Sequence, residues 1–181
     1  MRPVTKTPID VAAAVAQIDE NPELWNQFTL RKGYAPHSDM SDIWVRYNAW
    51  ENFRPRAPLK FHEEHHSTWY PAYDKLPALR PLIFGLMNVF AGTELGGVLI
   101  TRIPPGRSIG RHKDLGWHAG FFARKFAIML RSNHKQAFCF DGESMLTEPG
   151  EVFEFDNAHD HWVMNDSDTE RMTLIVSLRT T

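Results

Sequence analysis

The sequence has little that would tie the chain to a membrane, an oxidising compartment or a nucleic acid. Cys139 is the single cysteine among 181 residues, so no disulfide can form within the chain. No apolar run approaches the roughly 20 residues that cross a bilayer, and the first residues lack a secretory pattern. Lys and Arg number 20 against 22 Asp and Glu, and the formal net charge of −2 provides no global positive field. We expect a cytoplasmic protein without membrane or nucleic-acid partners, and its oligomeric state stays open.

Short segments with strand character fill the second half of the sequence. Asp141-Gly142 indicates a hairpin between two of these segments, and Glu148-Pro149-Gly150 indicates a turn. Short strands at near-regular spacing predict a mainly β fold, a cupin-like double-sheet jelly roll. The runs that support this prediction are 98–103, 125–130, 137–140, 152–155 and 172–178.

The first half mixes helical and extended signals. Residues 10–18 are rich in alanine, and Asn21-Pro22 is typical of a helix start, which predicts a second helix through Phe28. Residues 43–47 favour a strand, and 77–90 carry leucines at helical spacing up to Ala91-Gly92. We expect these N-terminal helices to buttress the jelly roll. Residues 1–181 would then form one domain, with 1–95 as a support region and 96–181 as the core.

His112-Lys113-Asp114 is the first candidate for metal binding. In an extended segment, residues two apart project to the same side, so one metal ion could take both the imidazole and the carboxylate. His161 follows 49 residues after His112, near the start of the last strand pair, where a jelly roll can return it to the same place. Two histidines and one carboxylate leave three positions of an octahedron open, which suits Fe(II). Taken alone, a surface histidine is the commoner explanation of such a pair.

Arg171 begins an otherwise apolar strand ten residues after His161. A planar guanidinium is suited to two-point recognition of a carboxylate. A solvated arginine at the end of a strand is the alternative if Arg171 is considered alone.

The ordered set of motifs over about residues 95–180 resembles the aspartyl/asparaginyl β-hydroxylase family. The resemblance implies a double-stranded β-helix, Fe(II) and 2-oxoglutarate, with O2 as the oxidant and hydroxylation of an unactivated carbon. The segments that carry it are Ile103-Pro104-Pro105-Gly106-Arg107-Ser108-Ile109-Gly110-Arg111-His112-Lys113-Asp114, Glu148-Pro149-Gly150-Glu151-Val152-Phe153-Glu154-Phe155-Asp156, His161-Trp162-Val163-Met164-Asn165 and Arg171.

The resemblance also implies roles for individual residues. His112 and His161 match the two iron-binding histidines, and Arg171 matches the arginine that pairs with the distal carboxylate of 2-oxoglutarate. Thr101 matches a hydroxyl that contacts the same carboxylate. Some members lack the carboxylate ligand, but Asp114 is present here, so we predict the full triad.

One segment departs from the family pattern. The family often has Arg-x-His on the strand after the first ligand, where this chain has Lys125-Phe126-Ala127. Lys125 is retained as a candidate cosubstrate contact, and Lys125, Ala127 and Met129 are expected to face one side of their strand.

Several residues near the motifs have competing interpretations. His159 competes with His161 for the iron, but the spacing to Arg171 favours His161 and leaves His159 at the rim. Asp156 and Asn165 suit either support of the ligands or turns. Residues 115–122 could form a mobile lid or a packing loop.

Two further clusters lie before the jelly roll. The cluster His62-Glu63-Glu64-His65-His66 could bind a second metal, although a solvated or substrate-lining segment is preferred. Arg54, Arg56 and Lys60 are interpreted as solvated surface.

Three hypotheses for function follow. The first is a hydroxylase acting on an amino-acid side chain in a peptide or protein, or on a free amino-acid-like molecule. The second keeps the iron chemistry but acts on a nucleotide or another small metabolite. The third is a non-catalytic, metal-binding cupin-like module. Arg171 and Thr101 argue against the third, because a simple metal holder needs no carboxylate clamp.

Overall fold

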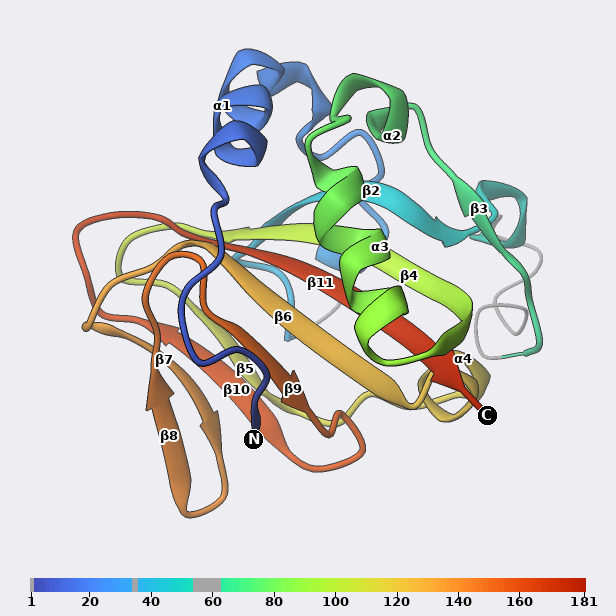
Figure 1. Cartoon of the computed structure of the whole chain (residues 1–181). Helices are drawn as coiled ribbons and strands as arrows, with labels where there is room; N and C mark the ends of the chain where they lie inside the picture. Colours follow the sequence, from blue (N-terminus) through green and yellow to red (C-terminus); the bar gives the residue numbers. More distant parts are fainter. Residues whose placement is uncertain (1, 34–35, 54–62) are drawn as a thin grey trace.

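Two antiparallel sheets form the body of the protein (Figure 1), which a computed structural model describes over residues 2–33, 36–53 and 63–181. Within these residues the larger sheet has seven strands in the order β1-β9-β6-β11-β4-β2-β3, and the smaller has four in the order β5-β10-β7-β8. This is the predicted double-stranded β-helix. Its strands are β1 (Arg2–Pro3), β2 (Ser41–Asn48), β3 (Ser67–Trp69), β4 (Gly92–Ile103), β5 (Ser108–His112), β6 (Arg124–Arg131), β7 (Gln136–Phe140), β8 (Glu143–Leu146), β9 (Val152–Phe155), β10 (His161–Asn165) and β11 (Arg171–Thr180).

Helices cover the outer face of the seven-stranded sheet (Figure 1). Leu79, Ile83 and Leu86 of α3 are buried in a core that also contains residues of α1, β4, β6 and β11. None of the helices in the described residues is long and apolar enough to cross a membrane. The helical segments are α1 (Ala12–Glu20), α2 (Ala72–Lys75), α3 (Leu79–Val89), α4 (Trp117–Phe121) and the short 3-10 helices η1 (Pro22–Leu24), η2 (Arg31–Gly33) and η3 (Trp50–Phe53).

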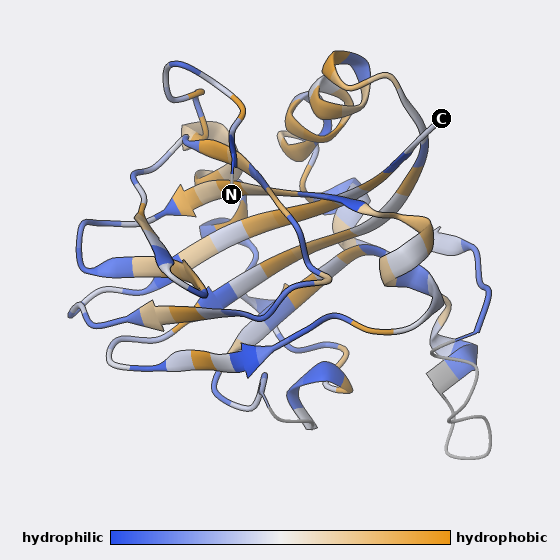
Figure 2. Cartoon of the chain, turned by 90° about the horizontal axis from the view of Figure 1, so that it is seen from below, coloured by the Kyte–Doolittle hydropathy of each residue, from blue (hydrophilic) through white to orange (hydrophobic). Residues whose placement is uncertain are grey.

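Side chains of the central strands alternate between the core beneath the helices and the space between the two sheets. On β11, Met172, Leu174 and Val176 pack into the core beneath the helices, whereas the intervening residues face the smaller sheet. A second core between the two sheets contains Phe153 and Phe138. In Figure 2, apolar residues lie mainly along the strands and helices, and hydrophilic residues lie in most connections.

Most of the predicted elements are confirmed. The helices expected at 10–18 and 77–90 correspond to α1 and α3, and each predicted strand overlaps an observed one. The expected hairpin joins β7 to β8, where Phe140 pairs with Glu143 and Gly142 has a φ of +73°. The strand predicted from 98 begins earlier, at Gly92, and includes Gly96 and Gly97.

The predicted helix from Asn21 to Phe28 is wrong. Only the single turn η1 forms, and the chain is already extended at Trp25, with φ −67° and ψ 132°. The side chain of Asn21 caps no helix but donates to the carbonyl of Gln17 at 2.8 Å. Asn26 then adopts a positive φ and its backbone N–H donates to the carbonyl of Asp42 at 2.9 Å. Pairing with β2 therefore outweighs the local helix signal.

Gly96 and Gly97 on β4 allow the segment around α4 to lie directly against the sheet. A Cβ at Gly96 would lie 2.5 Å from the ring of Phe122, which is almost completely buried. A Cβ at Gly97 would lie 3.2 Å from His118 Nε2. These glycines mark close packing rather than a turn.

Gly96→Ala is expected to lower the free energy of unfolding by about 1–3 kcal/mol, because the added methyl forces the Phe122 ring to shift. Urea unfolding followed by circular dichroism measures this. Gly85→Ala within α3 is the control, since a Cβ there meets nothing within 4 Å, and removing a helical glycine should stabilise by about 0.5–1 kcal/mol. Equal effects of the two substitutions would contradict the packing argument.

Candidate functional site

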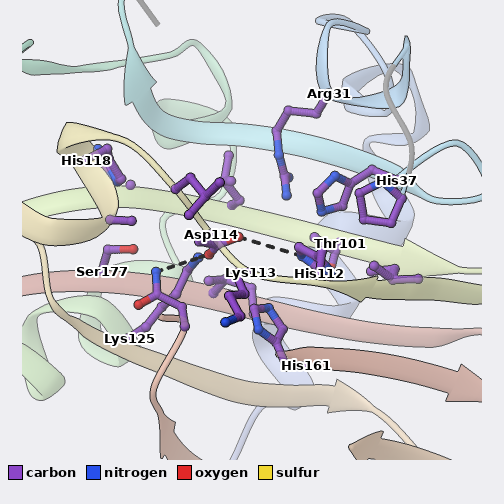
Figure 3. Close-up of a pocket in the computed structure, with 18 of the residues that line it drawn as sticks. Arg31, His37, Thr101, His112, Lys113, Asp114, His118, Lys125, His161 and Ser177 are labelled. Carbon is purple, nitrogen blue, oxygen red and sulfur yellow. Dashed lines mark hydrogen bonds and ion pairs between the residues drawn. The ribbon is translucent and has the colours of Figure 1, made fainter. Parts of the chain in front are cut away.

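Three candidate metal ligands meet where β5 pairs with β10. His112 lies directly opposite His161 in this antiparallel pair, and opposed residues project from the same face of a sheet. Asp114 follows the end of β5, and its backbone N–H donates to the carbonyl of Asn157 at 2.9 Å. The ligand atoms of His112, Asp114 and His161 all lie within 4.8 Å of one another (Figure 3). The sequence spacing therefore becomes a compact cluster.

Backbone carbonyls orient both imidazoles. The Nδ1 atom of His112 lies 2.8 Å from the carbonyl oxygen of Gly110, and that of His161 lies 2.9 Å from the carbonyl oxygen of His159. A carbonyl only accepts, so each neutral imidazole carries its proton on Nδ1 and has a lone pair on Nε2. Burial lowers the pKa of His161 and favours this neutral form. Both rings are thus prepared to bind a metal through Nε2.

The two oxygens of the Asp114 carboxylate have different surroundings. Oδ2 accepts from the Lys125 ammonium and, at 3.1 Å, from the side-chain amide of Asn157. Oδ1 faces the site, 3.7 Å from Nε2 of His112 (Figure 3). Burial opposes ionisation of Asp114, but the ammonium of Lys125 outweighs it and holds the pKa well below its usual range. Asp114 is therefore ionised at neutral pH and has one oxygen available as a ligand.

A cavity of about 910 Å³ opens beside this cluster, between the two sheets. The seven-stranded sheet contributes polar side chains to it through the alternation described above. These are Thr101 on β4, Lys125 on β6, and Arg171 and Ser177 on β11. Ala127 and Met129 continue the cavity-facing side of β6 in the core between the sheets, which confirms the expected direction of that strand.

Arg171 is a cation buried without a carboxylate partner in the described part of the chain. The residue is only 2% exposed. Its Nη1 donates to the hydroxyl of Thr173 at 2.7 Å, its Nη2 approaches the sulfur of Met129 at 3.5 Å, and its Nε has no partner. Burial lowers the pKa to about 10, so the guanidinium is charged at neutral pH. Such a group needs an anion to offset its desolvation.

Thr101 lies beside this guanidinium. It pairs across the strands with Thr173, which accepts the hydrogen bond from Arg171. Thr101 is buried and lines the cavity. The two residues named by the resemblance are therefore neighbours on one face of the larger sheet.

The first half of the chain supplies cavity residues that sequence reasoning missed. Arg31 of η2 points into the cavity (Figure 3) and is paired with the buried Asp42 at 3.1 Å. The ring of His37 lies 4.9 Å from that of His112, and burial, followed by the charge of Arg31, lowers its pKa to about 3. No motif or period marks these loop residues. Ser177 could have been found, since it continues the two-residue period from Arg171 and Thr173.

The residues with competing interpretations are separated by their hydrogen bonds. His159 is exposed and bonds Asp156 at 3.0 Å, outside the cavity, although its carbonyl orients His161. Asp156 also caps the N–H of Ala158 at 2.9 Å, as expected of a turn. The side-chain nitrogen of Asn165 lies within 3.0 Å of three backbone carbonyl oxygens, those of Ile103, Pro104 and Thr169. Asn157, in the same turn as Asp156, donates from its side chain to the candidate ligand Asp114 at 3.1 Å.

Residues 115–122 are described in full, whereas the clusters predicted between residues 54 and 66 are described only in part. Residues 115–122 contain α4 and pack against β4, as expected of the packing-loop interpretation. Of the histidine cluster, His62 lies outside the described residues, as do Arg54, Arg56 and Lys60. His65 lines the cavity, and the described ranges hold no metal cluster other than His112, Asp114 and His161.

A jelly roll that holds two histidines and a carboxylate beside a cavity is typical of metal-dependent oxygenases. The sequence profile of the aspartyl/asparaginyl beta-hydroxylase family matches residues 10–181, so the chain belongs to this family, which supports a hydroxylase-type oxygenase. Comparison with curated proteins finds no match.

Several solved structures are similar to this chain. An oxidoreductase of the 2OG-Fe(II) oxygenase family from Burkholderia pseudomallei is 17% identical with a TM-score of 0.51, over 94% of this chain and 90% of that one. A predicted oxalate decarboxylase from Thermotoga maritima is 20% identical with a TM-score of 0.39, over 53% and 73%. A cupin domain from Bordetella pertussis is 19% identical with a TM-score of 0.38, over 49% and 85%. At this identity, the Burkholderia protein shows the shared fold alone.

Lys125→Met is expected to raise the pKa of Asp114, because burial then opposes ionisation without the ammonium. In the wild type, the lowered pKa makes ionised Asp114 a stabilising group above its unfolded value of about 3.9, and this contribution is lost only as the pH falls through the folded value. The Lys125→Met variant should lose this stabilising contribution at a higher pH than the wild type. Titration of the Asp114 Cγ resonance in metal-free protein measures the shift. Lys113→Met is the control, and an equal shift in both variants would contradict the assignment.

Proposed function

We propose that the chain is an Fe(II)- and 2-oxoglutarate-dependent dioxygenase that hydroxylates an unactivated carbon. Its substrate is an amino-acid side chain in a peptide or protein, or a free amino-acid-like molecule. The observation that carries the proposal is the combination of a two-histidine, one-carboxylate cluster with a buried, unpaired arginine in the same cavity. The cluster requires a divalent metal ion, and the buried arginine requires an anion.

The donor set fits Fe(II). His112 and His161 would bind through Nε2, because hydrogen bonds to backbone carbonyls occupy both Nδ1 atoms. Asp114 would bind through Oδ1, because Lys125 and Asn157 hold Oδ2. Neutral imidazoles with one carboxylate are the ligand types that non-haem Fe(II) oxygenases use, and the three leave open positions for other ligands.

The cavity fits 2-oxoglutarate. Arg171 offers two-point recognition of a carboxylate, and Thr101 lies beside it with a hydroxyl that can donate to the same group. We assign the distal carboxylate of 2-oxoglutarate to this pair. Lys125 lines the same cavity, and its contact with Asp114 keeps a positive charge beside the metal cluster. We retain it as a lower-ranked cosubstrate contact.

When bound, Fe(II) with 2-oxoglutarate and O2 supplies oxidative decarboxylation coupled to hydroxylation of the substrate. The protein supplies the geometry. Arg171 and Thr101 fix the orientation of the cosubstrate, and Lys125 with Asn157 fixes the carboxylate of Asp114. Apolar residues such as Phe138, Phe155 and Val163 line the cavity near His161 and limit the access of water.

The decisive experiment is formation of succinate from 2-oxoglutarate with Fe(II) and O2. His112→Ala removes a ligand and should reduce succinate formation at least 100-fold, with loss of Fe(II) binding measured in parallel. His159→Ala is the matched control, because that histidine is exposed and outside the cavity. If the wild type binds neither Fe(II) nor 2-oxoglutarate, the proposal fails. If the wild type binds both but forms no succinate, a cupin-like binding module becomes the better description.

Arg171→Met should have opposite effects on binding and on folding. The affinity for 2-oxoglutarate should fall about 10- to 100-fold, as a charge-assisted hydrogen-bonded pair is worth about 1.5–3 kcal/mol. In the ligand-free protein the variant should be no less stable, because it removes an uncompensated buried charge. Calorimetric titration of Zn(II)-substituted protein and thermal unfolding measure the two effects. Arg179→Met, on the same strand but exposed, should leave the affinity unchanged, and an equal loss there would contradict the assignment.

A further inference from the structure

Two histidines outside the metal cluster form a hydrogen-bonded pair in the wall of the cavity. His65 precedes β3 and His118 belongs to α4, and both line the cavity. His118 Nδ1 lies 3.2 Å from His65 Nε2. The ring planes are within 3° of parallel and the centroids are 5.2 Å apart. Because the centroids are much further apart than the facing nitrogens, the rings meet edge to edge, as an N–H···N hydrogen bond requires.

The direction of this bond follows from the other side of His65. His65 Nδ1 lies 3.0 Å from the carbonyl oxygen of Glu63, and a carbonyl only accepts, so His65 carries its proton on Nδ1. Burial lowers the pKa of His65 and lowers that of His118 to about 3, so both rings are neutral. A neutral His65 then has a lone pair on Nε2, and His118 must donate its Nδ1 proton to it. Nε2 of His118 is left without a proton.

This acceptor nitrogen lies beside Gly97, and both residues line the cavity. A Cβ on Gly97 would lie 3.2 Å from His118 Nε2, so a larger residue at this position would crowd the nitrogen. The ring is held by aromatic contacts with Tyr47, at 5.7 Å between centroids, and Phe122, at 4.8 Å. Within the described ranges no donor is bonded to His118 Nε2, and the residue lines the cavity.

We propose that His118 Nε2 and Gly97 form a substrate subsite that accepts a hydrogen bond from an N–H or O–H donor and disfavours a carboxylate. Calling the occupant a substrate rests on the proposed oxygenase function, whereas the acceptor itself does not. The subsite is separate from Arg171, whose guanidinium the proposed function assigns to the distal carboxylate of 2-oxoglutarate.

Nitrogen-15 NMR of the full-length, histidine-labelled protein tests the subsite, with Zn(II) as a diamagnetic substitute for iron. The Nε2 signal of His118 is expected in the range of an unprotonated imidazole nitrogen. Methylammonium and acetamide, one charged and one neutral donor, should shift it upfield with saturation. Tetramethylammonium, N,N-dimethylacetamide and acetate, which lack N–H donors, should not. A protonated Nε2, an equal response to donor-free probes, or no response to any probe would overturn the proposal.

Gly97→Ala provides the matched variant, because the new methyl would lie 3.2 Å from Nε2 and crowd it, while both histidine side chains are retained. The response to methylammonium and acetamide should weaken at least tenfold, whereas Gly85→Ala should keep the wild-type response. An unchanged response in Gly97→Ala would place the acceptor elsewhere and overturn the subsite. Succinate formation is measured on the same preparations. An NMR response to the donors without succinate formation supports the subsite and counts against the oxygenase function. Succinate formation without an NMR response to the donors supports the oxygenase function and overturns the subsite.

Discussion

The pairing of β5 with β10 is the constraint on which the rest of the site depends. Antiparallel strands place opposed side chains on the same face, so the register that sets His112 opposite His161 creates half of the metal site in one step. The loop after β5 then returns Asp114 to Asn157, whose carbonyl and amide hold it. A shift of one residue in this register would direct the two imidazoles to opposite faces and remove the cluster.

The seven-stranded sheet places the buried guanidinium of Arg171 in the wall of the cavity. Its apolar face is covered by helices, which frees the other face of β4 and β11 for Thr101, Arg171 and Ser177. Arg171 costs desolvation and has no carboxylate to offset it within the described residues. Stability alone would favour an apolar residue at this position. The arginine is therefore best explained by an anionic ligand, and its neighbours are arranged to support one.

The first half of the chain does more than buttress the jelly roll. Arg31, His37, Tyr47, Asn52 and His65 all line the cavity. The candidate iron ligands and the proposed cosubstrate contacts come from the second half, whereas the N-terminal elements form another wall of the same cavity, with the ring of His37 beside that of His112. Differences in this wall would change which molecule enters while the iron chemistry stays the same. The His65–His118 pair joins the two halves across that wall.

Local sequence determined six of the strands (β2, β4, β6, β7, β9 and β11), the 79–89 helix, the β7–β8 hairpin and the order of His112, Asp114, His161 and Arg171, because alternation, turn residues and motif spacing are properties of neighbouring residues. It misjudged 21–28, where a hydrogen bond to β2 replaces a helix, and it began β4 at 98 instead of at Gly92. Only the tertiary structure placed Arg31, His37, Asn157 and the His65–His118 pair in the cavity. Their partners are distant in the chain, so no local period marks them, and the proton positions of the imidazoles depend on carbonyls that the fold brings within reach.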